Sequence, residues 1–134
     1  GLPEKTQADN SAAGEQFKAG ELLAPRKTFI QNFKKAGLKM PIVHKGWFAD
    51  FTPDDVPERI IFAFFDGDFY ESIADSFRAC DGKFQETVTI IVDDYANEAL
   101  PGAARAVDEW IKNNQQFTIR TEASLAIISS CPKT

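Results

Sequence analysis

Residues Ile60–Ser72 read Ile-Ile-Phe-Ala-Phe-Phe-Asp-Gly-Asp-Phe-Tyr-Glu-Ser, and Val88–Tyr95 read Val-Thr-Ile-Ile-Val-Asp-Asp-Tyr. Each stretch is a run of apolar, mostly branched or aromatic residues that ends abruptly in acids. Such runs are typical of strands buried on both faces, as in a parallel sheet covered by helices. In open α/β sheets, ligands bind at the carboxyl ends of the strands. The two stretches therefore predict an acidic site at one edge of a sheet.

The composition favours a single soluble globular domain. The chain has 134 residues, of which 43% are hydrophobic and 26% are charged; this length suits one domain with a core and is short for two. The formal net charge is −5 and no basic cluster alternates with aromatic residues, so we do not expect nucleic acid as a partner. Cys80 and Cys131 form neither a disulfide framework nor a metal-type pair, which favours a reducing compartment.

No apolar run approaches the roughly 20 residues of a membrane span, and no signal segment opens the chain. We therefore expect the cytoplasm or another soluble intracellular compartment, including an organelle if the N-terminus is processed. Residues 1–20 have no sustained hydrophobic period and are expected to form a loop, lid or tail, whereas residues 21–134 form one α/β domain.

Hydrophobic spacing predicts strands that alternate with helices, which favours a parallel sheet with right-handed crossovers. His44, the only histidine, is expected to be an ordinary residue at a strand end. The expected elements, in chain order, are a helix over Glu21–Gly37, a strand over Pro41–His44, a loop or helical turn over Asp50–Glu58, a strand over Ile60–Phe65, a helix from Tyr70 to about Phe84, a strand over Val88–Val92, a helix from Leu100 to about Asn114, and a hairpin of Gln116–Arg120 with Ser124–Ser129.

The acids at the two strand ends are expected to lie close together. Parallel strands joined by a helix are often neighbours, about 4.8 Å apart, with their carboxyl ends at one edge. Asp66 and Asp93 each follow directly after an apolar run. Adjacent carboxylates repel one another unless a cation neutralises them, and oxygen ligands suit Mg²⁺, Mn²⁺ or Ca²⁺. The alternative is that these acids are only helix caps and turn formers.

Several short motifs together resemble the macrocin O-methyltransferase family. The opening Gly-Leu-Pro-Glu also resembles a loop of that family. The motifs are Gly46-Trp47-Phe48, Asp66-Gly67-Asp68-Phe69-Tyr70-Glu71-Ser72, Ile91-Val92-Asp93-Asp94-Tyr95, Leu100-Pro101-Gly102 and Ala106-Val107-Asp108.

The resemblance implies a class I methyltransferase that uses S-adenosylmethionine (SAM) and Mg²⁺ to methylate a sugar or polyol hydroxyl of a small molecule. It implies that Asp66, Asp93 and Asp94 hold the metal and that Asp68 is the general base. Gly46, Trp47 and Phe48 are expected to bind the cofactor, although plain packing of the two aromatic residues is an alternative. Tyr70 and Tyr95 are expected to line the acceptor pocket or to hydrogen-bond the backbone.

The chain departs from the family at two places. The turn before the second acidic strand, Lys83–Thr87, lacks the usual Pro and Gly. The family's glycine-bearing first strand and its second strand come before Gly-Leu-Pro-Glu, so we expect this chain to be the C-terminal portion of a longer protein. The expected fold is then a partial Rossmann-like sheet, mostly parallel, with a C-terminal antiparallel hairpin and without the first two strands.

An alternative function is a non-catalytic, methyltransferase-like structural or interaction subunit. The expected partner of the enzyme is a small-molecule acceptor. Assembly into a homo-oligomer or a larger complex stays open.

Overall fold

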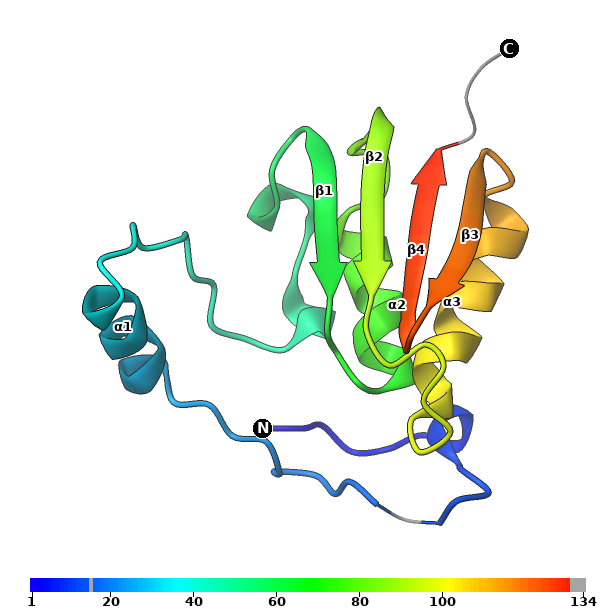
Figure 1. Ribbon diagram of the computed structural model, residues 1–134, viewed down its shortest axis with the longest axis horizontal. Coiled ribbons are helices and arrows are strands. Elements are labelled where there is room, and N and C mark those ends of the chain that lie inside the picture. Colours follow the sequence, from blue (N-terminus) through cyan, green and yellow to red (C-terminus); the bar gives the residue numbers. More distant parts are fainter. Residues whose placement is uncertain (15, 131–134) are drawn as a thin grey trace.

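Four strands form one mixed sheet in a computed structural model of the chain, which describes residues 1–14 and 16–130 (Figure 1). The order across the sheet is β1-β2-β4-β3. Cys131, the second cysteine considered above, lies outside the described residues. The strands are β1 (Ile60–Phe65), β2 (Phe84–Val92), β3 (Phe117–Glu122) and β4 (Leu125–Ser130).

Within the described residues, the pairing of β1 with β2 is parallel, and β4 pairs antiparallel with both β2 and β3. The predicted C-terminal hairpin is confirmed. The prediction of a mostly parallel sheet is wrong, because a hairpin is necessarily antiparallel and its second strand also docks antiparallel beside β2. The sheet therefore has a parallel half, β1 with β2, and an antiparallel half.

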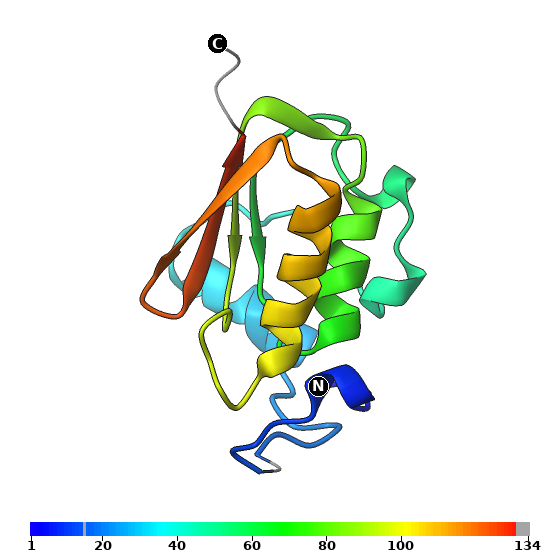
Figure 2. The same cartoon turned by 90° about the vertical axis from the view of Figure 1, so that its right-hand side faces the viewer.

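The helices α2 (Tyr70–Ala79) and α3 (Pro101–Asn113) pack side by side on one face of the sheet (Figure 2). Ile73 of α2 and Val107 of α3 are completely buried against Ile90 and Ile128 of the sheet. Each helix thus turns one apolar stripe towards the strands. Cys80 lies buried in the same core.

Aromatic rings form the end of this core. Phe77 stacks on Trp110 with ring centroids 4.3 Å apart, and the edge of Phe65 meets Phe77 at 5.0 Å. Trp110 in turn contacts Phe117 at 4.9 Å. This part of the core is therefore rich in aromatic residues, although other phenylalanines, including Phe62 at 57% exposure, lie on the surface.

The helix α2 ends earlier than predicted. α2 ends at Ala79 with Cys80 as its C-cap, and Gly82, whose φ of 72° is a left-handed conformation that glycine adopts readily, lies in the turn that leads into β2. Phe84, which the helical spacing included, begins β2 instead. Its ring contacts Trp110 and Phe117, so the same apolar position is satisfied from a strand.

The segment before β1 is more irregular than predicted. The helix α1 spans Arg26–Lys35, shorter than expected, because Pro25 occupies its N-cap position. Pro41–His44 forms no strand, so that prediction is wrong: the segment has no strand partner among the described residues, and Ile42 is 89% exposed. The prediction of a loop or helical turn over Asp50–Glu58 is confirmed by the short 3₁₀ helices η2 (Phe48–Asp50) and η3 (Pro53–Asp55).

The N-terminal residues form a loop that includes a further 3₁₀ helix, η1 (Gln7–Asp9). Leu2 and Asp9 are buried, and Leu2 exchanges backbone hydrogen bonds with Gly20 and Glu21. The loop lies beneath the starts of α2 and α3 (Figure 2). Across the described part of the chain, the helices are too short or too polar to cross a membrane.

Candidate active site

Acidic residues follow the carboxyl ends of the neighbouring strands β1 and β2. Phe65 pairs with Val92 at the end of the parallel ladder, and the Asp93 amide donates to the Phe65 carbonyl at 2.9 Å. One carboxylate oxygen from each of Asp66, Asp68 and Asp94 lies within 4.8 Å of the other two. These three carboxylates, called the acidic cluster below, come from both strand ends.

Asp93 faces its own loop. Its Oδ1 accepts a hydrogen bond from the Asp94 amide at 2.8 Å, and it is outside the acidic cluster as measured over the described residues. Asp94 is held in turn by Asn97, whose side-chain amide donates to Asp94 Oδ1 at 2.8 Å. Asp93 and Asn97 therefore fix the loop that carries the third carboxylate.

The carboxylates of the cluster affect one another's ionisation. Partial burial, together with the charges of Asp66 and Asp94, raises the pKa of Asp68 to about 6. Partial burial, followed by the charges of Asp93 and Asp94, also raises the pKa of Asp66. Such raised values mean that negative charge is costly here, and a cation bound between the oxygens would relieve that cost.

The two tyrosines named from the sequence flank this edge but direct their hydroxyls to α3. Tyr70 Oη donates to Glu109 Oε2 at 2.6 Å, and Tyr95 Oη donates to Asp108 Oδ1 at 2.8 Å. The expectation of backbone hydrogen bonds is not met, because the partners are side chains. A role in lining the acceptor pocket stays a prediction.

The Gly46-Trp47-Phe48 turn lies against the flank of α2. The guanidinium of Arg78 donates to the carbonyls of Phe48, Ala49 and Phe51, which fixes η2 beside the helix. Trp47 is 56% exposed and Phe48 is 39% exposed, so both rings are accessible. Binding of a cofactor by this turn stays a prediction, and the His44 ring contacts the Phe51 ring.

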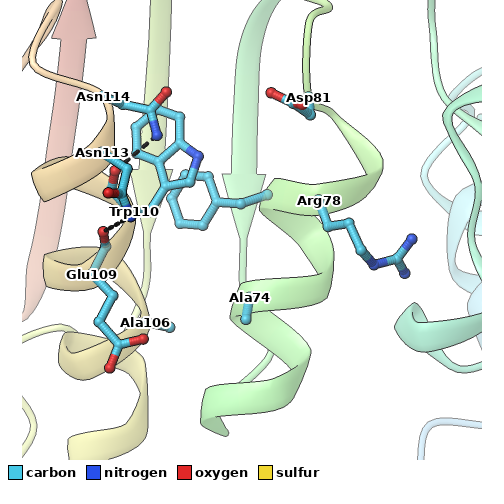
Figure 3. Close-up of a pocket in the computed structure, with 9 residues that line it drawn as sticks. Ala74, Arg78, Asp81, Ala106, Glu109, Trp110, Asn113 and Asn114 are labelled. Carbon is cyan, nitrogen blue, oxygen red and sulfur yellow. Dashed lines mark hydrogen bonds between the residues drawn. The ribbon is translucent and has the colours of Figure 1, made fainter.

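A groove of about 340 Å³ lies on the surface between α2 and α3 (Figure 3). Ala106 and Glu109 of α3 lie across from Ala74 of α2, Trp110 stacks on Phe77, and Arg78 points away towards η2. The cluster residues do not line this groove. It is thus a feature of the helical layer and not of the acidic strand ends.

Two residues near the site were not predicted from the sequence. Asn97 orders the second acidic loop through its hydrogen bond to Asp94. Asp9, in the N-terminal loop, accepts a hydrogen bond from the Tyr70 amide at the start of α2. The local signal for Asp9 was present: Thr6 and Asp9 form a capping box, the T-x-x-D pattern of a helix start. Its contact with Tyr70 had no local signal, because 61 residues separate the two.

Comparison with known proteins finds the same type of α/β fold in a solved methyltransferase structure and identifies the family of the chain. The family model for macrocin O-methyltransferase (TylF) matches residues 1–123, so the chain belongs to this family.

A solved structure, that of the O-methyltransferase NovP, is similar to this chain with a TM-score of 0.74 and 25% sequence identity. The match covers 97% of this chain and 56% of the NovP chain, so this chain spans just over half of that protein. The mixed four-stranded sheet is therefore shared with a known methyltransferase structure. A comparison with curated protein sequences finds no match.

Proposed function

We propose that the chain carries the acceptor-activating part of a SAM-dependent O-methyltransferase that requires a divalent cation, with a sugar or polyol hydroxyl as acceptor. Membership of the macrocin O-methyltransferase family and similarity to the O-methyltransferase NovP support methyl transfer to oxygen. The observation that carries the proposal is the acidic cluster, in which oxygens from both strand ends approach within 4.8 Å.

The residues of the cluster fit a divalent cation. All of the donors are carboxylate oxygens, the ligands that Mg²⁺ and Mn²⁺ prefer. Burial and the charges of neighbouring carboxylates raise the pKa of Asp66 and Asp68. A positive ion would therefore interact favourably with the ionised forms of both groups. Asp66, Asp93 and Asp94 would hold the ion, which would supply polarisation of the acceptor oxygen.

Asp68 is the base in this proposal. It lies beside Asp66 and Asp94, so a hydroxyl oxygen polarised by the cation would be close to its carboxylate, which can accept the proton. Asp68 would hold the proton that leaves the acceptor hydroxyl as that oxygen takes the methyl group. The exposed rings of Trp47 and Phe48, with Gly46, would contribute to binding SAM, and Tyr70 and Tyr95 would flank the acceptor.

Distance favours a second assignment of the acids. Asp68 belongs to the acidic cluster, whereas Asp93 turns Oδ1 to the Asp94 amide. In this second assignment Asp68 is a ligand and Asp93 only supports the loop. The two assignments differ in the expected effect of Asp68→Asn on cation affinity: little change for a base, and a loss of about tenfold or more for a ligand.

Calorimetric titration of Mg²⁺ into the metal-free chain tests the proposal. We expect one binding site in the wild type and a loss of at least about tenfold in affinity for Asp94→Asn. Glu98→Gln is the matched control, because it removes an exposed charge from the same loop and should change affinity less than about twofold. Absence of Mg²⁺ binding, or equal binding by Asp94→Asn, would refute the cation site and favour a non-catalytic role.

A further inference from the structure

The N-terminal loop holds a buried carboxylate against the start of α2. Asp9 is 2% exposed, and its Oδ1 accepts a hydrogen bond from the Tyr70 amide at 2.6 Å. Its Oδ2 accepts from the amide and the hydroxyl of Thr6, at 2.9 and 3.0 Å. Both oxygens of Asp9 are therefore used within the protein, and one of them reaches across 61 residues of sequence.

Tyr70 lies at the end of the turn that carries two of the acids. It is the first residue of α2 and comes two residues after Asp68, whose φ of 59° is left-handed. Phe69 occupies the N-cap position, and its side chain makes no capping hydrogen bond. A helix start leaves free amides that a capping oxygen normally satisfies. Asp9 supplies from a distance the cap that the local sequence lacks.

The start of α3 leaves room for the same Asp9 carboxylate. Gly102 is buried, and a Cβ added to it would overlap Asp9 Oδ1 and lie 2.7 Å from the Tyr70 nitrogen. Glycine at this position therefore leaves the space in which Asp9 reaches Tyr70. Arg105, on the next turn of α3, donates to the carbonyls of Gln7 and Ala8 and holds the loop in place.

Apolar contacts add to this attachment. Leu2 is buried with Phe69 and Leu100, which immediately precede α2 and α3, and Phe17 packs beside them. Ser11 Oγ donates to the carbonyl of Glu98 in the loop that follows the second acidic strand. The N-terminal loop thus contacts the segments after both acidic strand ends, as its position beneath the two helices shows (Figure 2).

We infer that Asp9 is a positioning residue for the acidic cluster. By fixing the Tyr70 amide beside Gly102, it holds the Asp66–Phe69 turn in the conformation that brings Asp66 and Asp68 to Asp94. This inference rests on the proposed function, because it gives Asp9 a role in cation binding at that site.

Mn²⁺ titration of the chain, followed by electron paramagnetic resonance of the free ion, tests the inference with a matched control. Asp9 and Asp55 both close a Thr-x-x-Asp capping box of a 3₁₀ helix, but Asp9 also reaches Tyr70. We expect Asp9→Ala to weaken Mn²⁺ binding about tenfold, and Asp55→Ala to leave it unchanged. Gly102→Ala keeps the Asp9 carboxylate but displaces it, so this variant should also weaken Mn²⁺ binding.

The outcomes separate the two proposals. If the wild type binds Mn²⁺ and the Asp9→Ala and Gly102→Ala variants bind it equally well, the positioning role is refuted and the cation site stands. Equal losses in Asp9→Ala and Asp55→Ala would also refute it, since loop stability alone would then explain the effect. If the wild type binds no Mn²⁺, both the cation site and the positioning role are refuted.

A measurement on the wild type covers the case in which the variants do not fold. Coupling between two sites is reciprocal, so a cation that benefits from the Asp9–Tyr70 hydrogen bond must also protect it. We expect saturating Mg²⁺ to slow hydrogen exchange at the Tyr70 amide at least about threefold relative to the Asp55 amide, which donates within η3. Equal protection at the two amides would contradict the inference.

Discussion

Asp68 and Asp94 adopt the same left-handed backbone conformation, with φ of 59° and 56°, at the ends of two adjacent parallel strands. Aspartate tolerates this region better than most residues, although it costs about 1 kcal/mol. Two residues in a sparsely populated backbone conformation therefore carry carboxylates whose oxygens lie within 4.8 Å of each other.

Asp68→Asn should stabilise the metal-free protein at neutral pH. Because the folded-state pKa of about 6 is above the ordinary value of 3.8, the wild type loses stability as pH rises from about 4 through 6. The variant cannot ionise, so its advantage should be near zero below pH 4 and about 1 kcal/mol at pH 7.5, after allowance for solvent screening. Urea unfolding at both pH values measures this difference.

Glu98→Gln is the control for Asp68→Asn, because its exposed carboxylate lies on the neighbouring loop. It should change the free energy of unfolding by less than about 0.5 kcal/mol at either pH. An Asp68→Asn advantage that is as large at pH 4 as at pH 7.5 would show that ionisation of the partly buried Asp68 carboxyl is not its cause.

Ultraviolet titration should detect late ionisation of both tyrosines, which are the only two in the chain. Burial and the hydrogen bond to Asp108 raise the pKa of Tyr95 to about 12, and the hydrogen bond to Glu109 is the main cause that raises the pKa of Tyr70. Since both folded-state values lie above the ordinary value, stability from these contacts is present below pH 10 and is lost as pH rises further.

Single variants assign the steps of this titration. Asp108→Ala should return the Tyr95 step towards pH 10 and leave the Tyr70 step in place. Absorbance near 295 nm gives both values directly. A wild-type tyrosine that titrates normally at pH 10 would be inconsistent with the hydrogen bonds to α3.

Phe77→Ala should destabilise the fold by about 3–5 kcal/mol, because the ring is 2% exposed between Phe65 and Trp110. Phe62→Ala is the matched control, since that ring is 57% exposed on β1 and its loss should cost less than about 1 kcal/mol. Thermal unfolding by circular dichroism measures both. Similar losses for the two variants would mean that the outer face of β1 is covered in solution.

The strands and helices around the acids were predictable from local patterns. The apolar run Ile60–Phe65 and the spacing within Pro101–Asn113 each indicate one structure, and the acids after β1 and β2 mark the sheet edge. Where a pattern fits two structures, the prediction failed. Phe84 continues a helical spacing and also begins a strand, and the φ of Gly82 decides between the two.

Contacts between distant segments were not predictable in the same way. Pro41–His44 has strand-like residues, but a strand also needs a partner, and sequence periodicity contains no information on partners. The hydrogen bond between Asp9 and Tyr70 depends on how the N-terminal loop packs under two helices. The position of the acids at two adjacent strand ends was therefore predictable, whereas the roles of Asp66, Asp68, Asp93 and Asp94 stay predictions and the residues that support the loops had no local signal.

The order of the strands has a consequence for synthesis of the protein in the cell. Of the four described strands, β4 is the last to leave the ribosome, yet it lies inside the sheet between β2 and β3. At typical translation rates, roughly 2 to 8 seconds pass between completion of Val92 and of Ser130. During this time one edge of β2 is open to pairing with other nascent chains. A chaperone that binds the growing chain after β2 has emerged and before β4 has been made would thus prevent this pairing.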